Sequence, residues 1–450
     1  MTSLHTYRAD IRQSFLLAYP VMLSQLGHVM MGVADNVMVG HVGATELAAA
    51  GLANVAFNML LLFGIGVSYA ITPLVAAADA EKNDLQVVET LRHGLAINIS
   101  TSLVLCVVVF FGKNILYYIN QPPEVVALAI PYLEIITFSI IPVMVFQSFR
   151  QFSEGLSNTW VPMVVVLCCN LLNIGLNYLL IYGHAGFPTM GLNGAGWATF
   201  TSRVAMALGL AAFVYGYRSF RKYRAAFVPG NYSRKLFNKM LHLGIPAGVQ
   251  FIFEVAAFDF SLVMMGWLGT QALAAHQIAI NLATISYMTT SGLAAAATIR
   301  VSQELGRGNR QSMQRAAYVL LGMALALMLL WGIVFIAGHS FLPRLYIADL
   351  AVLEIAGPII IIAGLFQLSD GMQVVCIGAL RGLQDVKVPS LLIFAAYWII
   401  GLPLGYVLGF QLHWGAPGIW TGLLIGLTLT ALAMLWRFRA LSQRIPLTSV

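Results

Sequence analysis

The sequence predicts an all-α polytopic membrane protein with twelve transmembrane helices, arranged as two parallel six-helix repeats around a central cleft. Of its 450 residues, 59% are hydrophobic and only 9% are charged, whereas soluble domains carry about 25% charged residues. Apolar runs of about 20 residues, enough for a helix to cross a bilayer, recur along the whole chain. Such long runs favour helices over the alternating strands of a β-barrel.

The apolar runs are separated by short links that carry Gly, Pro, Asn or charge. Their expected bounds are residues 14–36, 50–77, 93–112, 127–149, 160–183, 193–217, 240–268, 272–299, 315–337, 352–378, 388–410 and 415–436. One longer, strongly basic link joins the sixth run to the seventh. We therefore expect an N-terminal lobe at 1–222, a basic cytoplasmic linker at 223–240 and a C-terminal lobe at 241–450.

Lysine and arginine give the orientation. With both termini and the even-numbered links on one side, all but three of the 24 basic residues lie on that side. The exceptions are Lys113, Arg203, which lies within the sixth run, and Arg344. The positive-inside rule makes the basic side cytoplasmic. The polar first 14 residues lead into the first run without a small-residue cleavage site, so we expect no removable signal peptide.

The two halves of the sequence repeat. After a shift of 226 positions, residues 37–53 match residues 263–279 at eight positions, and Pro20 meets Pro246. Residues 155–162 match 382–389 after a shift of 227. Each half holds an even number of runs, so both begin on the same side and the repeats are parallel. Two such bundles are typical of secondary transporters, whose substrates bind near the membrane midplane.

Two carboxyl groups stand in the seventh run, Glu254 and Asp259. Five residues apart on a helix, they point about 140° away from each other, so each addresses different neighbours. An acid in mid-membrane costs about 2.5–3.5 kcal/mol on insertion scales. Either both are protonated and hydrogen-bonded within the bundle, or at least one binds a cation, a proton or a cationic ligand.

A second acid cluster is expected around Asp35, near the outer end of the first run. Asn170, Asn173 and Asn177 form one stripe of the fifth helix, and the sixth places Ala195 and Thr199 one turn apart. Amide, hydroxyl and backbone oxygens around a carboxylate suit a hard cation such as sodium. They would equally suit a proton on Asp35, and asparagines also serve simply to hold membrane helices together.

Further polar side chains could line a substrate cleft. In the tenth run, Asp370 has Gln367 and Gln373 three residues to either side, near one helix face. Gln373 repeats Gln147 under the 226 shift, and His28 falls opposite Glu254. For His28 alone, a hydrogen-bonded bundle histidine is the simpler interpretation. The residues considered for the cleft are Gln25, His28, Gln147, Gln367 and Gln373.

Several functions are disfavoured by what the sequence lacks. It contains no Walker A pattern, HExxH or GxSxG, so we expect neither an enzyme nor an ATP-driven transporter, and we expect no cofactor. The four cysteines, at 106, 168, 169 and 376, lie in apolar runs as small core residues. Nearly all the basic residues lie in links between runs, which gives no reason to expect nucleic-acid binding. Transport energy would come from an Na⁺ or H⁺ gradient.

Three stretches resemble the multidrug and toxic compound extrusion (MATE) family, in its NorM branch: residues 31–53, 254–281 and 370–389. The resemblance implies a bacterial inner-membrane antiporter, expected to be monomeric, that exports cationic amphipathic drugs in exchange for Na⁺ or H⁺. It also implies ion-coupling roles, in the N-lobe and then the C-lobe, for Asp35, Asn173, Asn177, Ala195, Thr199, Glu254 and Asp370. Sodium would bind at Glu254, Asp370 or Asp35.

Two positions depart from the family pattern. NorM members have Tyr one turn before the helix 10 acid, where this chain has Phe366. That change weakens a sodium site there but leaves a cation–π contact open. Asp259 has no counterpart in the pattern and could serve a separate contact or a second proton.

The sequence disfavours three rival functions. A lipid-linked oligosaccharide flippase of the same wider superfamily would need basic residues facing its pyrophosphate, whereas these runs hold acids and almost no bases. An intramembrane lipid-modifying enzyme would need paired catalytic groups or a metal motif, and none is visible. A channel is disfavoured because no filter-like loop is seen.

Overall fold

The computed structural model describes residues 4–118, 121–228, 230 and 232–445, and every regular element in this part of the chain is helical. By its internal contacts the chain divides into two units. The N-unit comprises Leu23–Gly248, and the C-unit comprises Met1–Met22 with Val249–Val450. The unit boundaries therefore fall inside two long helices, α1 (Leu4–Gly40) and α9 (Arg234–Leu268). The predicted lobes, 1–222 and 241–450, describe the sequence repeat and stay predictions.

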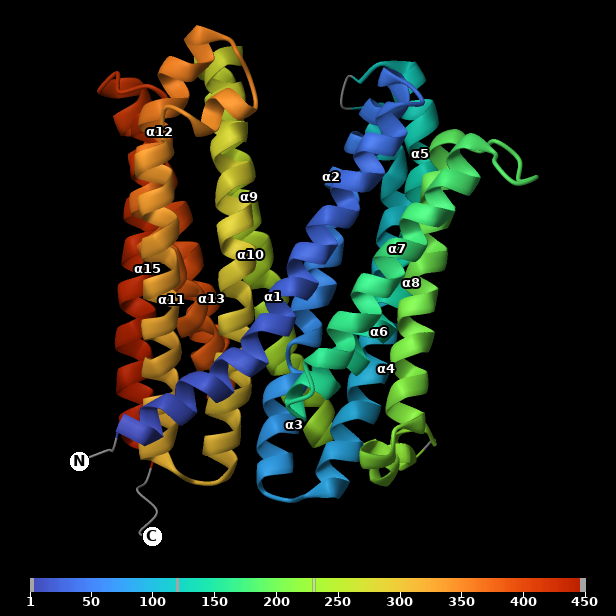
Figure 1. Cartoon of the computed structure of the whole chain (residues 1–450), viewed down its shortest axis with the longest axis vertical. Helices are drawn as coiled ribbons and strands as arrows, with labels where there is room; N and C mark the ends of the chain where they lie inside the picture. The colour runs from blue at the N-terminus through green and yellow to red at the C-terminus, as the bar shows by residue number, and fades with distance from the viewer. Residues whose placement is uncertain (1–3, 119–120, 229, 231, 446–450) are drawn as a thin grey trace. The chain divides into compact units, whose positions relative to one another are not determined.

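The N-unit is built from the second part of α1, the first part of α9 and the helices between them (Figure 1). These are α2 (Ala44–Ser68), α3 (Ile71–Ala80), α4 (Asp84–Gly112), the 3₁₀ helix η1 (Lys113–Tyr117), α5 (Pro123–Phe138), α6 (Ile140–Gly155), α7 (Trp160–Tyr182), α8 (Gly191–Gly216) and the 3₁₀ helix η2 (Arg218–Phe227).

The C-unit is built from the first part of α1, the second part of α9 and the helices after it. Within it, α1 begins and α15 ends at the same end, drawn at the bottom of Figure 1. The further elements are α10 (Thr270–Gly306), α11 (Arg310–Gly338), η3 (Leu342–Leu345), α12 (Leu350–Gly382), α13 (Lys387–Phe394), η4 (Ala395–Gly401), α14 (Leu402–Tyr406), η5 (Val407–Gln411) and α15 (Ala416–Arg444).

The predicted all-α polytopic fold is confirmed. Among the described residues, eleven helical stretches are long and apolar enough to cross a membrane. The remaining predicted span is α10, which is 37 residues long but less apolar than the others. Its apolar stripe is largely buried within the C-unit, where Ala275, Ala279 and Leu293 join the hydrophobic core.

Two predicted spans are each divided into two helices. The second span breaks between α2 and α3, and the fourth breaks at Ser139 between α5 and α6. Proline cannot donate a hydrogen bond to the carbonyl four residues earlier, but it is tolerated in the first turn of a helix. Pro73 and Pro142 each stand at the third position of the second helix. Each break therefore falls where the proline leaves a carbonyl without its helical partner.

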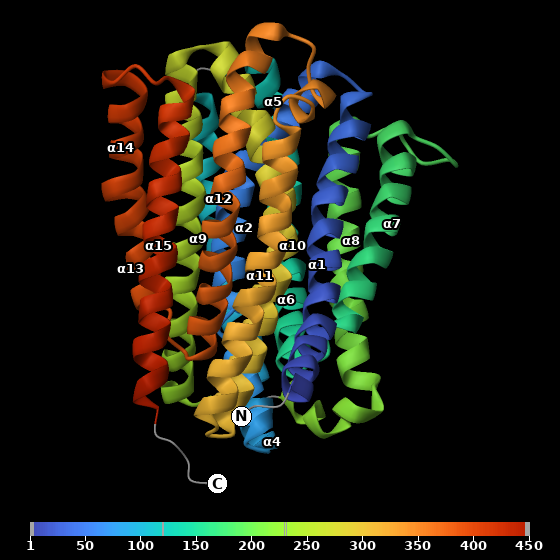
Figure 2. The ribbon, with the colours of Figure 1, turned by 60° about the vertical axis from the view of Figure 1, so that its left-hand side comes forward.

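Glycines set the close packing at the end of the chain. Gly401, Gly405 and Gly409, at intervals of four, lie against a matching row on α15. A Cβ added at Gly422 would lie 2.3 Å from the backbone nitrogen of Gly405. Small residues at this spacing let membrane helices approach closely. Figure 2 shows α13 and α14 running beside α15. The intervening η4 and η5 are π-helical turns.

Candidate functional site

In the N-unit, Asp35 of α1 lies at the centre of a polar cluster formed with α7 and α8. Asn177 Nδ2 donates to Asp35 Oδ1 at 2.5 Å, and Thr199 Oγ1 donates to Oδ2 at 3.4 Å. Asn177 also donates to Asn173 Oδ1 at 3.2 Å, and Asn173 donates to Thr199 Oγ1 at 3.5 Å. The helical spacing predicted from the sequence thus brings these four side chains together. Ala195, one turn before Thr199, is fully buried.

One atom of this cluster is left over. Asn177 Oδ1 is buried and has no hydrogen-bond partner among the described residues. A buried acceptor without a partner is costly. A hard cation could be held by this oxygen and Asp35 if the Asn177 amide turned, since Nδ2 now faces the carboxylate; amide and carboxylate oxygens are the ligands that such ions prefer. The donor set therefore fits Na⁺ by its chemistry.

Arg203, two turns after Ala195 on α8, is a basic neighbour of this cluster. It donates to Ser139 Oγ at 2.5 Å, and its guanidinium lies 4.9 Å from the ring centre of Phe57. Its charge is close enough to interact with Asp35, although the two form no ion pair within 4 Å. The sequence marked Arg203 only as an exception to the charge rule, because its partners come from two other helices.

The polar residues predicted deeper in the N-unit find different neighbours. Arg150 donates to Gln25 Oε1 at 3.4 Å and to Glu154 at 2.7 Å, inside a buried ion pair. Gln147 is 5% exposed, and its Oε1 has no partner in the described part of the chain. His28 is half-buried.

In the C-unit, Glu254 of α9 is linked to α12 and to the α13–α14 region. Gln373 Nε2 donates to Glu254 Oε1 at 2.8 Å, and the hydroxyl of Tyr397 donates to Gln373 Oε1 at 3.4 Å. Gln373 and Tyr397 are fully buried. This chain of contacts holds one carboxyl oxygen of Glu254 in place. Sequence reasoning missed Tyr397, whose only signal was a hydroxyl within an apolar span.

Of the other C-unit candidates, Asp370 lies near Glu254, whereas Gln367 and Phe366 contact other groups. Asp370 is 6% exposed and close enough for its charge to interact with that of Glu254. Gln367 donates to the carbonyl of Ala363 in its own helix at 3.1 Å. Phe366 is 4% exposed and makes edge contacts with Phe258 and Trp420, at ring distances of 6.1 and 6.0 Å. The ring of Phe366 is therefore engaged by aromatic neighbours.

Asp259 lies apart from these contacts. Its side chain is exposed, whereas that of Glu254 is half-buried, which agrees with the angle expected from their spacing. No group of three or more His, Cys, Asp or Glu side chains is placed to hold a metal ion among the described residues. A hard ion in either unit would therefore depend on one or two acids with amide, hydroxyl and backbone oxygens.

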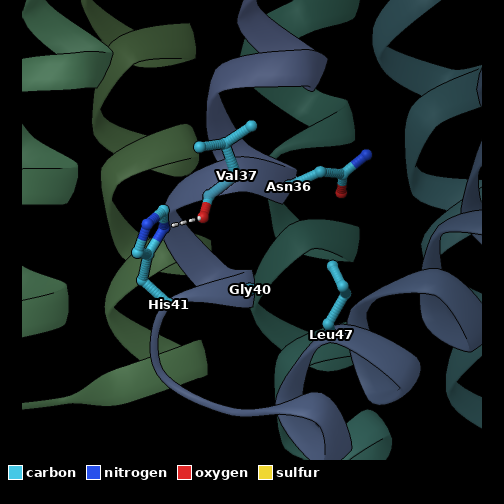
Figure 3. Close-up of a pocket in the computed structure, with 5 residues that line it drawn as sticks. All are labelled: Asn36, Val37, Gly40, His41 and Leu47. Carbon is cyan, nitrogen blue, oxygen red and sulfur yellow. Dashed lines mark hydrogen bonds between the residues drawn. The ribbon is translucent and has the colours of Figure 1, made fainter. Parts of the chain in front are cut away.

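A shallow hollow lies at the end of α1 and the start of α2 (Figure 3). It has a volume of about 400 Å³ and is lined by Asn36, Val37, Gly40, His41 and Leu47. The His41 ring is held by the carbonyl of Val37 at 2.7 Å. With few polar groups and a wide opening, the hollow lacks the convergent groups of a binding site.

The helical architecture, with acids buried in both units, is that of a polytopic membrane transporter. The MatE family model matches residues 20–179 and 246–407, one match in each sequence repeat. The chain belongs to the MatE family.

Relatives and solved structures agree over nearly the whole length. The chain is 35% identical to a probable multidrug resistance protein NorM of Rhizobium meliloti, covering 98% of this chain and 96% of the relative. It is 33% identical to the multidrug resistance protein MdtK of Yersinia pseudotuberculosis, covering 97% of each. The fold matches an outward-facing MATE transporter of the MOP superfamily with a TM-score of 0.88 at 18% identity, covering 98% and 97% of the two chains.

Proposed function

We propose that this protein is a secondary antiporter of the bacterial inner membrane that exports cationic amphipathic compounds in exchange for Na⁺ or H⁺. The observation that carries the proposal is the presence of acids within the spans of both units: the half-buried Asp35 in the N-unit, and the half-buried Glu254 with the buried Asp370 in the C-unit. Family membership and the NorM and MdtK relatives support multidrug efflux as the activity.

The chemistry of each cluster supports competition between an ion and a drug. A carboxyl group within a membrane is costly unless it is neutralised or paired. Neutral donors hold each acid: Asn177 and Thr199 for Asp35, and Gln373 for Glu254. These hydrogen bonds bring no positive charge, so a proton, a sodium ion or a cationic drug can match the negative charge that the nearby Arg203 and Arg381 offset only in part. Binding of the incoming ion would then favour release of the drug.

Ion and drug need not use the same unit. Around Asp35 the nearby charge of Arg203 partly offsets the single acid. In the C-unit the charge of Arg381 acts on Glu254, and the nearby Asp370 adds a second acid. A site with two acids and one neighbouring arginine would attract a cationic drug or sodium more strongly than a site with one acid and one neighbouring arginine. On this basis the C-unit is the stronger cation site.

The experiment is efflux of ethidium from cells that lack their own pumps, driven by an imposed sodium gradient or an imposed proton gradient. We compare the parent with Asp35→Asn and Glu254→Gln, which remove one charge each with little change of shape. Asp84→Asn is the matched control, because Asp84 is half-exposed and pairs with Lys222 outside the spans. We expect the control to behave as the parent.

Sodium-driven efflux lost in Glu254→Gln would assign coupling to the C-unit despite Phe366. Proton-driven efflux lost only in Asp35→Asn would assign it to the N-unit. Coupled efflux that is unimpaired in both variants would refute the proposal.

The flippase function remains the rival within the same fold. A solved MOP superfamily transporter from Pyrococcus furiosus, with a TM-score of 0.87 at 17% identity, is described as having a binding pocket of reverse polarity. One fold can therefore serve different substrates. Absence of cation efflux under either gradient would favour the flippase.

A further inference from the structure

The short helix η2, between α8 and α9, has three distinct rows of side chains. A 3₁₀ helix has three residues per turn, so side chains three apart lie above one another. Phe220, Tyr223 and Ala226 form a buried row. Arg218, Arg221 and Arg224 form a second row at the same spacing. This second row is called the arginine row below.

The buried row fixes η2 firmly to the N-unit. The ring of Phe152 on α6 lies 6.0 Å from that of Phe220 and 5.6 Å from that of Tyr223. The hydroxyl of Tyr223 donates to Asp79 Oδ1 at 3.2 Å, and Arg92 of α4 donates to the carbonyl of Ala225 at 2.6 Å. Because η2 is held through one row, the direction of the arginine row is fixed as well.

Of the four basic side chains of this helix, two form ion pairs or hydrogen bonds to the protein, and two are exposed without an ion pair among the described residues. Arg224 is held by the carbonyl of Tyr215 at 2.7 Å and lies 4.7 Å from its ring. Lys222 pairs with Asp84 at 2.6 Å, and this hydrogen bond raises the pKa of Lys222. Arg218 and Arg221 are exposed and form no ion pair within the described residues. They lie one turn apart on the same row, about 6 Å along the helix axis.

The position of η2 indicates what that anion is. The helix begins two residues after α8 ends at Gly216, and the charge rule places this end of α8 at the cytoplasmic face. The flanking side chains of Tyr215 and Tyr217 are 51% and 47% exposed. Exposed tyrosines beside a span are typical of the level of the lipid headgroups. Arg218 and Arg221 would then lie among headgroup phosphates.

We propose that Arg218 and Arg221, held by η2, bind the phosphodiester headgroup of an anionic phospholipid in the cytoplasmic leaflet. Guanidinium groups match phosphate with paired hydrogen bonds, and basic residues next to a span attract anionic lipid. Tyr215 and Tyr217 would contact the glycerol region. The site is independent of the transport proposed above.

The test counts lipids bound to the full-length protein in detergent micelles by native mass spectrometry. Phosphatidylglycerol is titrated against phosphatidylcholine for the parent and for R218Q/R221Q. The matched control is K235Q/K239Q, which removes two exposed charges from the start of α9. A third variant, R218K/R221K, keeps both charges but removes the fork geometry. Inorganic phosphate is added as a competitor in a separate arm.

We expect the parent to prefer phosphatidylglycerol and R218Q/R221Q to bind it about 25-fold more weakly, from about fivefold for each of the two charges. K235Q/K239Q should keep the preference, and R218K/R221K should retain part of it. Equal losses in the two glutamine variants would show general charge attraction and overturn the site. An unchanged R218Q/R221Q, or displacement of the lipid by inorganic phosphate at equal concentration, would also overturn it. Both mutated arginines are exposed, so unchanged thermal unfolding is the check on folding.

Discussion

Replacing Asp10 by Asn should destabilise the C-unit more than its position near the chain end suggests. Asp10 is 6% exposed, and each of its oxygens accepts from a different arginine. Arg300 Nη2 donates to Oδ1 at 2.7 Å, and Arg315 Nε donates to Oδ2 at 2.6 Å. These contacts tie the start of α1 to α10 and α11.

The magnitude follows from the burial of Arg300. Its side chain is 4% exposed, and its Nε has no partner among the described residues. Without the Asp10 charge, Arg300 would keep only neutral partners such as the amide of Gln13. Removing one partner of a buried ion pair costs about 3–5 kcal/mol, because the other charge stays buried and uncompensated. The exposed pair of Asp84 and Lys222 contributes only about 0–1 kcal/mol.

The assay is unfolding of the purified protein in mixed micelles with increasing denaturing detergent, followed by tryptophan fluorescence. Asp10→Asn should lose at least about 2 kcal/mol more unfolding free energy than Asp84→Asn. In the double variant Asp10→Asn/Arg300→Met the buried charge is gone, so it should be more stable than Asp10→Asn alone. Equal losses in Asp10→Asn and Asp84→Asn would refute the reasoning. So would a double variant whose loss equals the sum of the losses in Asp10→Asn and in Arg300→Met alone.

Two further predictions concern packing and the C-unit acid. Gly378→Ala should strongly destabilise the C-unit because the new Cβ would lie 2.2 Å from the carbonyl oxygen of Ala294. Gly322→Ala should be tolerated because a Cβ there meets nothing within 4 Å. Thermal unfolding of both variants checks this, and equal stability of the two would contradict it. Gln373→Leu should weaken coupling through Glu254 by about tenfold or more, from the loss of a hydrogen bond to a charged group of about 1.5–3 kcal/mol. Ethidium efflux against sodium concentration measures this effect, and an unchanged sodium dependence would contradict it.

The apolar runs predicted the approximate positions of the spans but not their ends or breaks. The helices extend well beyond the apolar runs, as in α1, which begins at Leu4 where the run was expected to begin at residue 14. Helical hydrogen bonding can continue into water, so the apolar run indicates the part of the helix that lies in the membrane and not where the helix ends. The missing N–H of proline explains the breaks before Pro73 and Pro142. The same rule would also have predicted breaks at prolines that lie inside continuous helices, namely Pro20, Pro131, Pro246 and Pro358.

The site was predictable where it lies along single helices and hidden where it joins several. The stripe of Asn173 and Asn177 follows from helical period, and the structure places both with Asp35. The partners of Gln373 and Arg203 come from helices far apart in sequence, and no local pattern encodes those contacts. Lys113, another exception to the charge rule, pairs with Glu134. The positive-inside rule counts only basic residues, so it could not predict this pairing with an acid 21 residues away.

The two repeats share a fold but do not carry the same chemistry. Under the 226 shift, Glu254 and Gln373 correspond to His28 and Gln147, and Asp35 corresponds to Ser261. In the C-unit the carboxyl of Glu254 accepts from Gln373, whereas in the N-unit Gln147 Oε1 lacks a partner in the described residues. The N-unit instead places its acid at Asp35, close to the outer end of α1. Since the acids occupy non-equivalent positions in the repeat, a cation would meet different ligands in each unit. We therefore expect the two units to differ in ion preference. Ion binding that is lost by replacing the acid of one unit should not be restored by the acid of the other unit.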